Sequence, residues 1–111
     1  MEITFKNAKL QEVCSSEKRR IKKFGKICSD RIMARLDDLQ AANTLADFRF
    51  LPGRCHELKG DRKGQLTLDI EHPLRLVFKP SNDGIQNRKE GVLNWNLVTA
   101  VEIVDVEDTH D

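Results

Sequence analysis

Two short segments in the middle of the chain alternate apolar and polar residues, and this alternation limits the folds that the sequence can adopt. They span residues 65–71 and 74–79 and are separated only by His72-Pro73, a spacing typical of an antiparallel hairpin. Successive side chains of a strand point to opposite faces, so the apolar members are expected to enter one core. These are Leu66, Leu68, Ile70, Leu74, Leu76 and Phe78.

The opposite face of this predicted sheet is mainly polar and basic. We expect Thr67 and Asp69 to face water there, with Arg75, Val77 and Lys79 on the same side of the next strand. The sequence therefore predicts a sheet with one apolar face and one basic face.

The remaining patterns predict helices before this hairpin and one strand after it. Residues 1–5 read as a first strand, and an apolar stripe at helical spacing predicts one helix that ends at Gly25. A second helix is expected over 27–42, and further strands over 54–58 and 98–106. The last strand is apolar on both faces and is expected to be central, after a polar loop from 80 to about 94. The stripe of the first helix comprises Leu10, Val13, Cys14, Ile21 and Phe24.

These elements imply one α+β domain that spans residues 1–111, with an N-terminal helical hairpin packed on a mainly antiparallel β-sheet. A chain of 111 residues with 39% hydrophobic and 33% charged residues is typical of a single globular domain. No apolar run approaches the roughly 20 residues of a membrane helix, and the first residues lack a secretory signal. We therefore expect a cytoplasmic protein without a membrane partner.

The three cysteines, Cys14, Cys28 and Cys55, form no C-x-x-C pair, so neither a disulfide framework nor a zinc site is indicated. Cys55 precedes His56, which suggests a nucleophile with its base. Adjacent residues of a strand point to opposite faces, however, so we do not expect these two side chains to meet.

Histidine is the side chain best suited to acid–base chemistry near neutral pH, and the chain has three: His56, His72 and His110. His72 lies in the predicted hairpin turn and is interpreted as a solvated residue. His110 follows the last strand, which could hold it near the sheet. His56 precedes a run of cations and is the strongest candidate from its surroundings alone.

The cations that surround His56 in the sequence and on the next strands are Lys59, Arg62, Lys63, Arg75 and Lys79. Gly60 and Gly64 bracket the first of these charges and predict a tight turn with exposed tips. Such cations can hold a phosphodiester and stabilise the charge that develops at phosphorus. No metal-ligating residues cluster in the sequence, so the predicted phosphoryl chemistry uses no metal and no other cofactor.

Four stretches together resemble the HigB branch of the RelE/ParE toxin superfamily of toxin–antitoxin modules. They are 51–53 (L-P-G), 55–64 (C-H-E-L-K-G-D-R-K-G), 75–78 (R-L-V-F) and 107–110 (E-D-T-H). That family typically reads L-H-P-L-K-G-D-R-x-G, then W-R-I-x-F, and closes with D-Y-H. The resemblance implies a RelE-like fold and ribosome-dependent cleavage of mRNA, neutralised by a HigA-like antitoxin.

Carried over by position, the resemblance also implies functional residues. His56, Asp108 and His110 match the family's catalytic positions, with the two histidines as proton-transfer groups whose acid and base roles stay open. Arg75 and Lys59 match phosphate-stabilising positions. Arg62, Lys63 and Lys79 are expected to contact the RNA backbone.

Two residues depart from the family pattern: Thr109 stands where the family has Tyr, and Glu57 stands where it has Pro. These departures keep two alternatives open. One is a ParE-like protein that poisons DNA gyrase, and the other is a catalytically weak relative that retains antitoxin binding.

Overall fold

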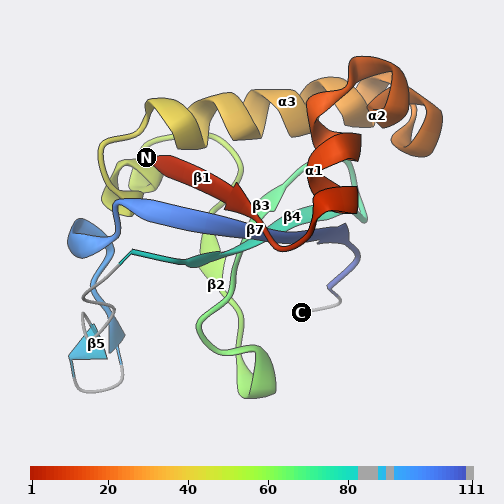
Figure 1. Cartoon of the computed structure of the whole chain (residues 1–111). Coiled ribbons are helices and arrows are strands. Elements are labelled where there is room, and N and C mark those ends of the chain that lie inside the picture. The colour runs from red at the N-terminus through yellow and green to blue at the C-terminus, as the bar shows by residue number, and fades with distance from the viewer. Residues whose placement is uncertain (83–87, 90–91, 110–111) are drawn as a thin grey trace.

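The computed structural model describes residues 1–82, 88–89 and 92–109, and within them a layer of helices covers one face of a β-sheet (Figure 1). The sheet order is β1-β7-β4-β3-β2, with β1 parallel to β7 and the other neighbours antiparallel. The predicted α+β architecture is confirmed. The main strands are β1 (Glu2–Phe5), β2 (His56–Glu57), β3 (Leu66–Asp69), β4 (Arg75–Pro80) and β7 (Ala100–Glu107).

The predicted hairpin is formed by β3 and β4, in which Leu66 pairs with Phe78 and Leu68 with Leu76. These four side chains are fully buried and form the core against the helices. β7 is an interior strand, as expected, but it alternates buried and partly exposed residues and lies between β1 and β4. The apolar face of the sheet is thus the one that the sequence pattern predicts.

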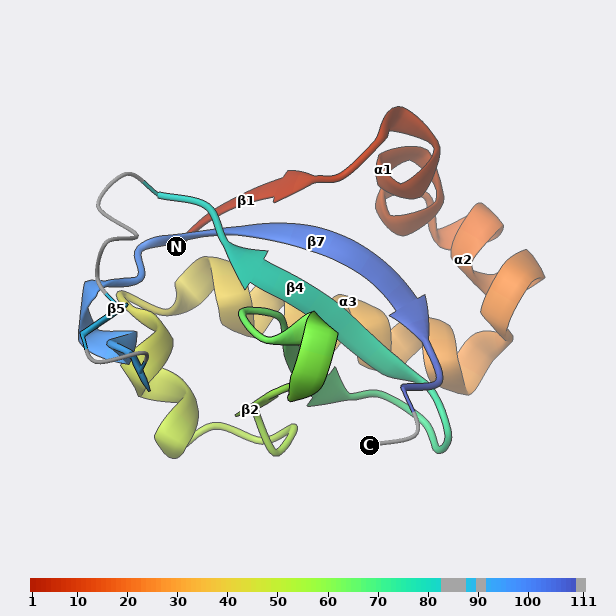
Figure 2. The ribbon, with the colours of Figure 1, turned by 90° about the horizontal axis from the view of Figure 1, so that it is seen from below.

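The second face of the sheet is more covered than we expected. Thr67 and Val77, predicted to face water and to lie on a basic face, are both fully buried. Thr67 pairs with His56 of β2 on one side and with Val77 on the other. β2 and the segment after it lie over the middle of this face (Figure 2), which accounts for the burial of Thr67 and Val77.

The first predicted helix is two helices. α1 (Ala8–Ser15) ends and α2 (Glu17–Phe24) begins at Ser16, whose hydroxyl accepts the backbone N–H of Arg19 at 3.2 Å. A serine that caps α2 in this way satisfies an otherwise unpaired N–H group. The hairpin therefore contains three helices, with α3 (Lys26–Ala41) as the long one that lies across the sheet (Figure 1).

Buried Arg20 stabilises this break in the helix. Its Nη1 donates to the backbone oxygen of Cys14 at 2.6 Å, and its Nε donates to Ser29 Oγ of α3 at 3.2 Å. Only 7% of Arg20 is exposed. The residue thus joins the end of α1, the middle of α2 and the start of α3.

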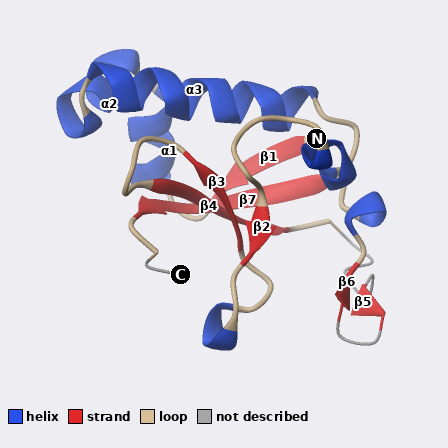
Figure 3. Ribbon diagram, turned by 180° about the vertical axis from the view of Figure 1, so that it is seen from behind, coloured by secondary structure: helices blue, strands red, loops and turns tan. Residues whose placement is uncertain are grey.

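The polar excursion predicted over 80–94 is only partly described. β4 extends through Pro80, and Asn82 bonds to Leu97 and Thr99 on the far side of the excursion. Residues 88–89 (β5, Arg88–Lys89) and 92–93 (β6, Val92–Leu93) pair as a small antiparallel ladder beside the main sheet (Figure 3). The rest of this predicted loop lies outside the described residues. The described residues also form short 3-10 turns at Leu45–Arg49, Gly60–Arg62 and Trp95–Leu97.

No helix among the described residues is long and apolar enough to cross a membrane.

We predict that Arg20→Ala lowers the free energy of unfolding by about 1–3 kcal/mol, because it leaves the buried Cys14 carbonyl without its donor. The matched control is Arg19→Ala, which removes an exposed pair with Glu12 and is expected to cost less than about 1 kcal/mol. Denaturant unfolding followed by circular dichroism measures both values. Equal losses for the two variants would contradict this role of Arg20.

Candidate active site

A pocket of about 570 Å³ opens on the second face of the sheet and joins residues that are distant in the sequence. One side is the segment from β2 through the turn at Gly60–Arg62, and the other side is Thr109, which follows β7. The described residues that line it are His56, Glu57, Leu58, Lys59, Asp61, Arg62 and Thr109. Seen from below, β7 ends beside the start of β4 (Figure 2).

Arg75 connects the pocket to the sheet. At the start of β4 it pairs with Glu107 of β7, so its side chain lies where the C-terminal residues leave the sheet. Its Nη1 donates to Thr109 Oγ1 at 2.8 Å, and its Nε lies 3.5 Å from Asp69 Oδ1. The side chain is only 18% exposed. A guanidinium held on both sides in this way is a preorganised cation next to the pocket.

His56 is held by its neighbours in β2 and β3. It pairs with Thr67, whose hydroxyl oxygen lies 3.5 Å from both ring nitrogens, and its Nδ1 lies 3.0 Å from the backbone oxygen of Arg54. The residue is half-buried and lines the pocket. The imidazole is therefore held by main-chain and hydroxyl contacts at the wall of the pocket.

The segment between β2 and β3 is fastened at three points. Glu57 Oε2 accepts the backbone N–H of Gly64 at 3.1 Å, which closes the turn. Arg62 donates from Nε to Gln65 Oε1 at 3.0 Å and from Nη2 to Glu107 Oε1 of β7. Arg62 thus ties this turn to the strand that leads to Thr109, which fixes the width of the pocket.

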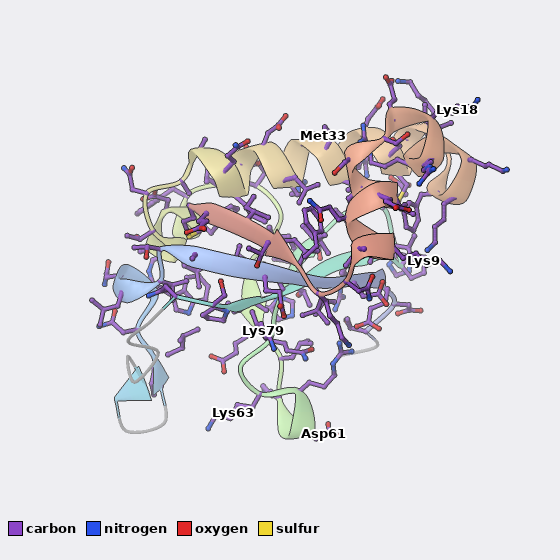
Figure 4. The ribbon with its side chains drawn as sticks, in the orientation of Figure 1. Lys9, Lys18, Met33, Asp61, Lys63 and Lys79 are labelled. Carbon is purple, nitrogen blue, oxygen red and sulfur yellow. The ribbon has the colours of Figure 1, made fainter. Side chains whose placement is uncertain are left out.

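The predicted RNA-binding cations have different surroundings. Lys59 lines the pocket, and both Lys59 and Lys63 are exposed and form no ion pair with the described part of the chain. Lys79 lies 3.4 Å from Glu102 Oε2 and does not line the pocket among the described residues. Figure 4 places Lys79 below the sheet and Lys63 further out, near Asp61 on the turn. Lys59 and Lys63 are the cations best placed to contact a polyanion.

The last predicted residues are only partly described. Asp108 is exposed and directly precedes the pocket residue Thr109, but it does not itself line the pocket. His110 lies outside the described residues. Thr109 itself was known from the sequence only as a departure from the family pattern. The contact between Arg75 and Thr109 gives its hydroxyl a structural role that spacing alone did not indicate.

The sequence also gave no sign that Glu57, Asp61 and the backbone of Arg54 belong to the site. Glu57 replaces a family proline, and its hydrogen bond to Gly64 depends on the closed turn. The one sequence signal for an unusual backbone conformation at this point is Gly53, which precedes Arg54. No group of three His, Cys, Asp or Glu residues that could hold a metal ion occurs in the described part of the chain.

Cys55 is partly buried against the core, and this burial raises the pKa of its thiol to about 12. The neutral thiol is a poor nucleophile, because the reactive species is the thiolate. Burial also raises the pKa of the Cys14 and Cys28 thiols. The structure agrees with the expectation that Cys55 and His56 do not form a nucleophile pair, since His56 lines the pocket and Cys55 packs inward.

We predict that iodoacetamide at pH 8 alkylates the folded protein far more slowly than the denatured chain. The ordinary thiol pKa is 9.0, so the unfolded chain gains thiolate as the pH approaches 9 while the folded Cys55 stays protonated until about pH 12. The raised pKa also makes the free energy of unfolding depend on pH. The protonated Cys55 thiol favours the folded state fully below pH 9, and this contribution to the free energy of unfolding is lost as the pH rises toward 12. Mass spectrometry of timed samples gives both rates, and equal rates for Cys55 would refute the prediction.

Three solved structures that share this fold are toxins of the YoeB/ParE type. A "YoeB/ParE toxin from Agrobacterium tumefaciens" is 14% identical, with a TM-score of 0.58 over 97% of this chain and 98% of that chain. The YoeB–YefM complex from Staphylococcus aureus is 17% identical, with a TM-score of 0.58. The YoeB dimer from the same organism is 18% identical, with a TM-score of 0.57. Each of these two alignments covers 96% of this chain and 94% of the other.

The chain therefore has the RelE/ParE-like toxin fold, over 96–97% of its length. These neighbours are YoeB/ParE-type toxins and do not single out the HigB branch. No protein-family model and no curated protein matches the sequence.

Proposed function

We propose that this protein is the toxin of a toxin–antitoxin module and that it cleaves mRNA on the ribosome. The observation that carries the proposal is the pocket in which His56 and Lys59 meet Thr109, itself bonded to Arg75, on a toxin fold. An imidazole for proton transfer and cations for phosphate binding are the two requirements of RNA cleavage by the ribose 2′-hydroxyl. The resemblance of the sequence to HigB toxins supports the same reaction.

In this reaction the 2′-oxygen forms a bond to the adjacent phosphorus, and the bond from phosphorus to the 5′-oxygen breaks. One group takes the 2′-hydroxyl proton, and another protonates the leaving 5′-oxygen. We assign proton transfer to His56 and His110, count Asp108 among the catalytic residues, and assign stabilisation of the phosphorane to Arg75 and Lys59. All of these roles are chemically within reach of protein side chains alone.

The surrounding cations hold the RNA in this proposal. Lys59 and Lys63 lie on the exposed turn, where their ammonium groups can follow a phosphate backbone. Lys79 adds positive charge from the same face of the sheet, and Arg62 supports the pocket wall through Glu107. Contacts of this kind position the strand without reading its sequence.

We also propose that a cytoplasmic antitoxin, HigA-like according to the sequence resemblance, holds the protein inactive. The support from structure is that one neighbour of the same fold was solved as a complex of YoeB with YefM. A toxin that acts on translating ribosomes requires such control.

We predict that His56→Ala lowers the rate of translation-dependent mRNA cleavage by about 10²–10⁴-fold, because it removes a proton-transfer group. The matched control is His72→Ala, which removes an exposed histidine of the β3–β4 turn and should leave cleavage unchanged. Primer extension on transcripts from a reconstituted translation reaction measures the rate. His110→Ala is expected to behave like His56→Ala, and antitoxin binding should persist in all three variants.

Other outcomes would reject the proposal in favour of a specific alternative. Growth arrest with intact transcripts and stalled DNA replication would indicate a gyrase poison. No arrest, combined with tight binding of the antitoxin, would indicate a relative that has only the binding function. Full cleavage activity in His56→Ala would remove this histidine from the mechanism.

We predict that Lys59→Gln combined with Lys63→Gln weakens binding to single-stranded RNA and makes binding less dependent on salt. Each lost phosphate contact reduces the slope of log K against log salt concentration by about 0.7. Lys18→Gln is the control, because Lys18 lies on α2 at the opposite side of the molecule from Lys63 (Figure 4). Fluorescence anisotropy at several salt concentrations gives the slopes, and identical slopes for both variants would exclude Lys59 and Lys63 as RNA contacts.

A further inference from the structure

The backbone just before His56 has an unusual conformation. Arg54 has φ = 52°, and within the described ranges it is the only residue other than glycine with a positive φ. This left-handed conformation costs roughly 1–2 kcal/mol for a residue with a Cβ atom. Such a conformation persists only where the surrounding structure enforces it, and it is typical of functional sites.

Contacts from α3 and β3 enforce this turn. Gly53 has φ = 112°, and a Cβ atom there would lie 2.9 Å from both Arg35 Nε and Leu68 Cδ2, so only glycine fits. The Gly53 carbonyl accepts the backbone N–H of Asp69 at 2.7 Å, and Arg35 Nε donates to the Asp69 carbonyl at 2.9 Å. Arg54 Nε donates to Asp69 Oδ2, also at 2.9 Å. Asp69 therefore holds the turn through its N–H and its carboxylate, and α3 holds Asp69.

The turn directs the Arg54 carbonyl at the imidazole of His56. The distance from this oxygen to Nδ1 is 3.0 Å. A carbonyl oxygen can only accept a hydrogen bond, so Nδ1 must carry a proton. When the ring is neutral, the lone pair is then on Nε2, on the other side of the ring.

We propose that the Gly53–Arg54 turn fixes His56 in the Nδ1-protonated tautomer and thereby makes Nε2 the general base of the reaction. Nε2 takes the proton of the 2′-hydroxyl, the 2′-oxygen bonds to phosphorus, and the 5′-oxygen leaves with a proton from a second group. The base role depends on the proposed ribonuclease function, whereas the tautomer does not. Gly53 and Arg54 are positioning residues, since they act through His56 rather than on the RNA.

Two substitutions separate the backbone of Arg54 from its side chain. Arg54→Gly loses the guanidinium but adopts a positive φ readily, so it keeps the carbonyl in place. Arg54→Val loses the same guanidinium, and its branched side chain strongly disfavours a positive φ. A difference between these two variants therefore reports on the direction of the carbonyl and not on the ion pair with Asp69.

The test is ¹⁵N NMR of the histidine rings, recorded at a pH where His56 is neutral, with His56→Gln to assign the signals. The wild type and Arg54→Gly should show a protonated Nδ1 and an unprotonated Nε2, and Arg54→Val should show a mixture of tautomers. The rate of RNA cleavage should be retained in Arg54→Gly. In Arg54→Val it should fall about 3- to 10-fold, because this is the effect expected from the loss of one hydrogen bond.

The outcomes distinguish this inference from the proposed function. A protonated Nε2 in the neutral His56 ring of the wild type would overturn the inference that the turn fixes the tautomer. This test needs only the wild type, so it holds even if Arg54→Val fails to fold. Equal spectra for folded Arg54→Gly and Arg54→Val would also overturn it. If the wild type shows the expected tautomer but never cleaves RNA, the positioning by the turn is supported and the ribonuclease proposal fails.

Discussion

The pairing of β4 with β7 is the interaction on which the candidate site depends. Because the two strands are antiparallel and Arg75 pairs with Glu107, the chain that follows β7 emerges where β4 begins. β3 also ends there, since Asp69 pairs with Arg75. Residues from three parts of the sequence thus converge at one end of the sheet, and the contact of Arg75 with Thr109 follows from this register.

The cations on the second face of the sheet, opposite the helices, form two groups. Arg75, Arg54 and Arg62 have carboxylate partners on neighbouring elements, and these contacts hold the turn and the pocket wall in place. Lys59 and Lys63 sit on the exposed turn without an ion pair to the described residues. Arginine suits the first task because its planar group binds two partners at once, whereas lysine suits loose contact with phosphates. The arginines organise the site, and the lysines are the cations available to the RNA that we propose as substrate.

The sequence predicted the features that depend on local pattern and missed those that depend on tertiary contacts. Alternation identified the β3–β4 hairpin, but it could not show that β2 buries Thr67 and Val77 on the second face. Helical spacing continued through Ser16, because the break depends on Arg20 reaching Cys14 and Ser29. The proximity of residue 109 to His56 was suggested by family resemblance, not by spacing.

Thr109 shows how the site can work without the aromatic residue that the resemblance leads one to expect. A tyrosine at this position could stack on a base, but the chain contains no Tyr, and the Thr109 hydroxyl accepts a hydrogen bond from Arg75 instead. The position therefore orients the guanidinium of Arg75. In the reaction that we propose, transition-state stabilisation at this end of the sheet rests on the imidazole of His56 and on fixed charge, and Lys59 and Lys63 help to place the substrate. The strained Gly53–Arg54 turn has a clear purpose in that proposed reaction, because proton transfer requires a defined direction of the His56 ring and the Arg54 carbonyl sets this direction.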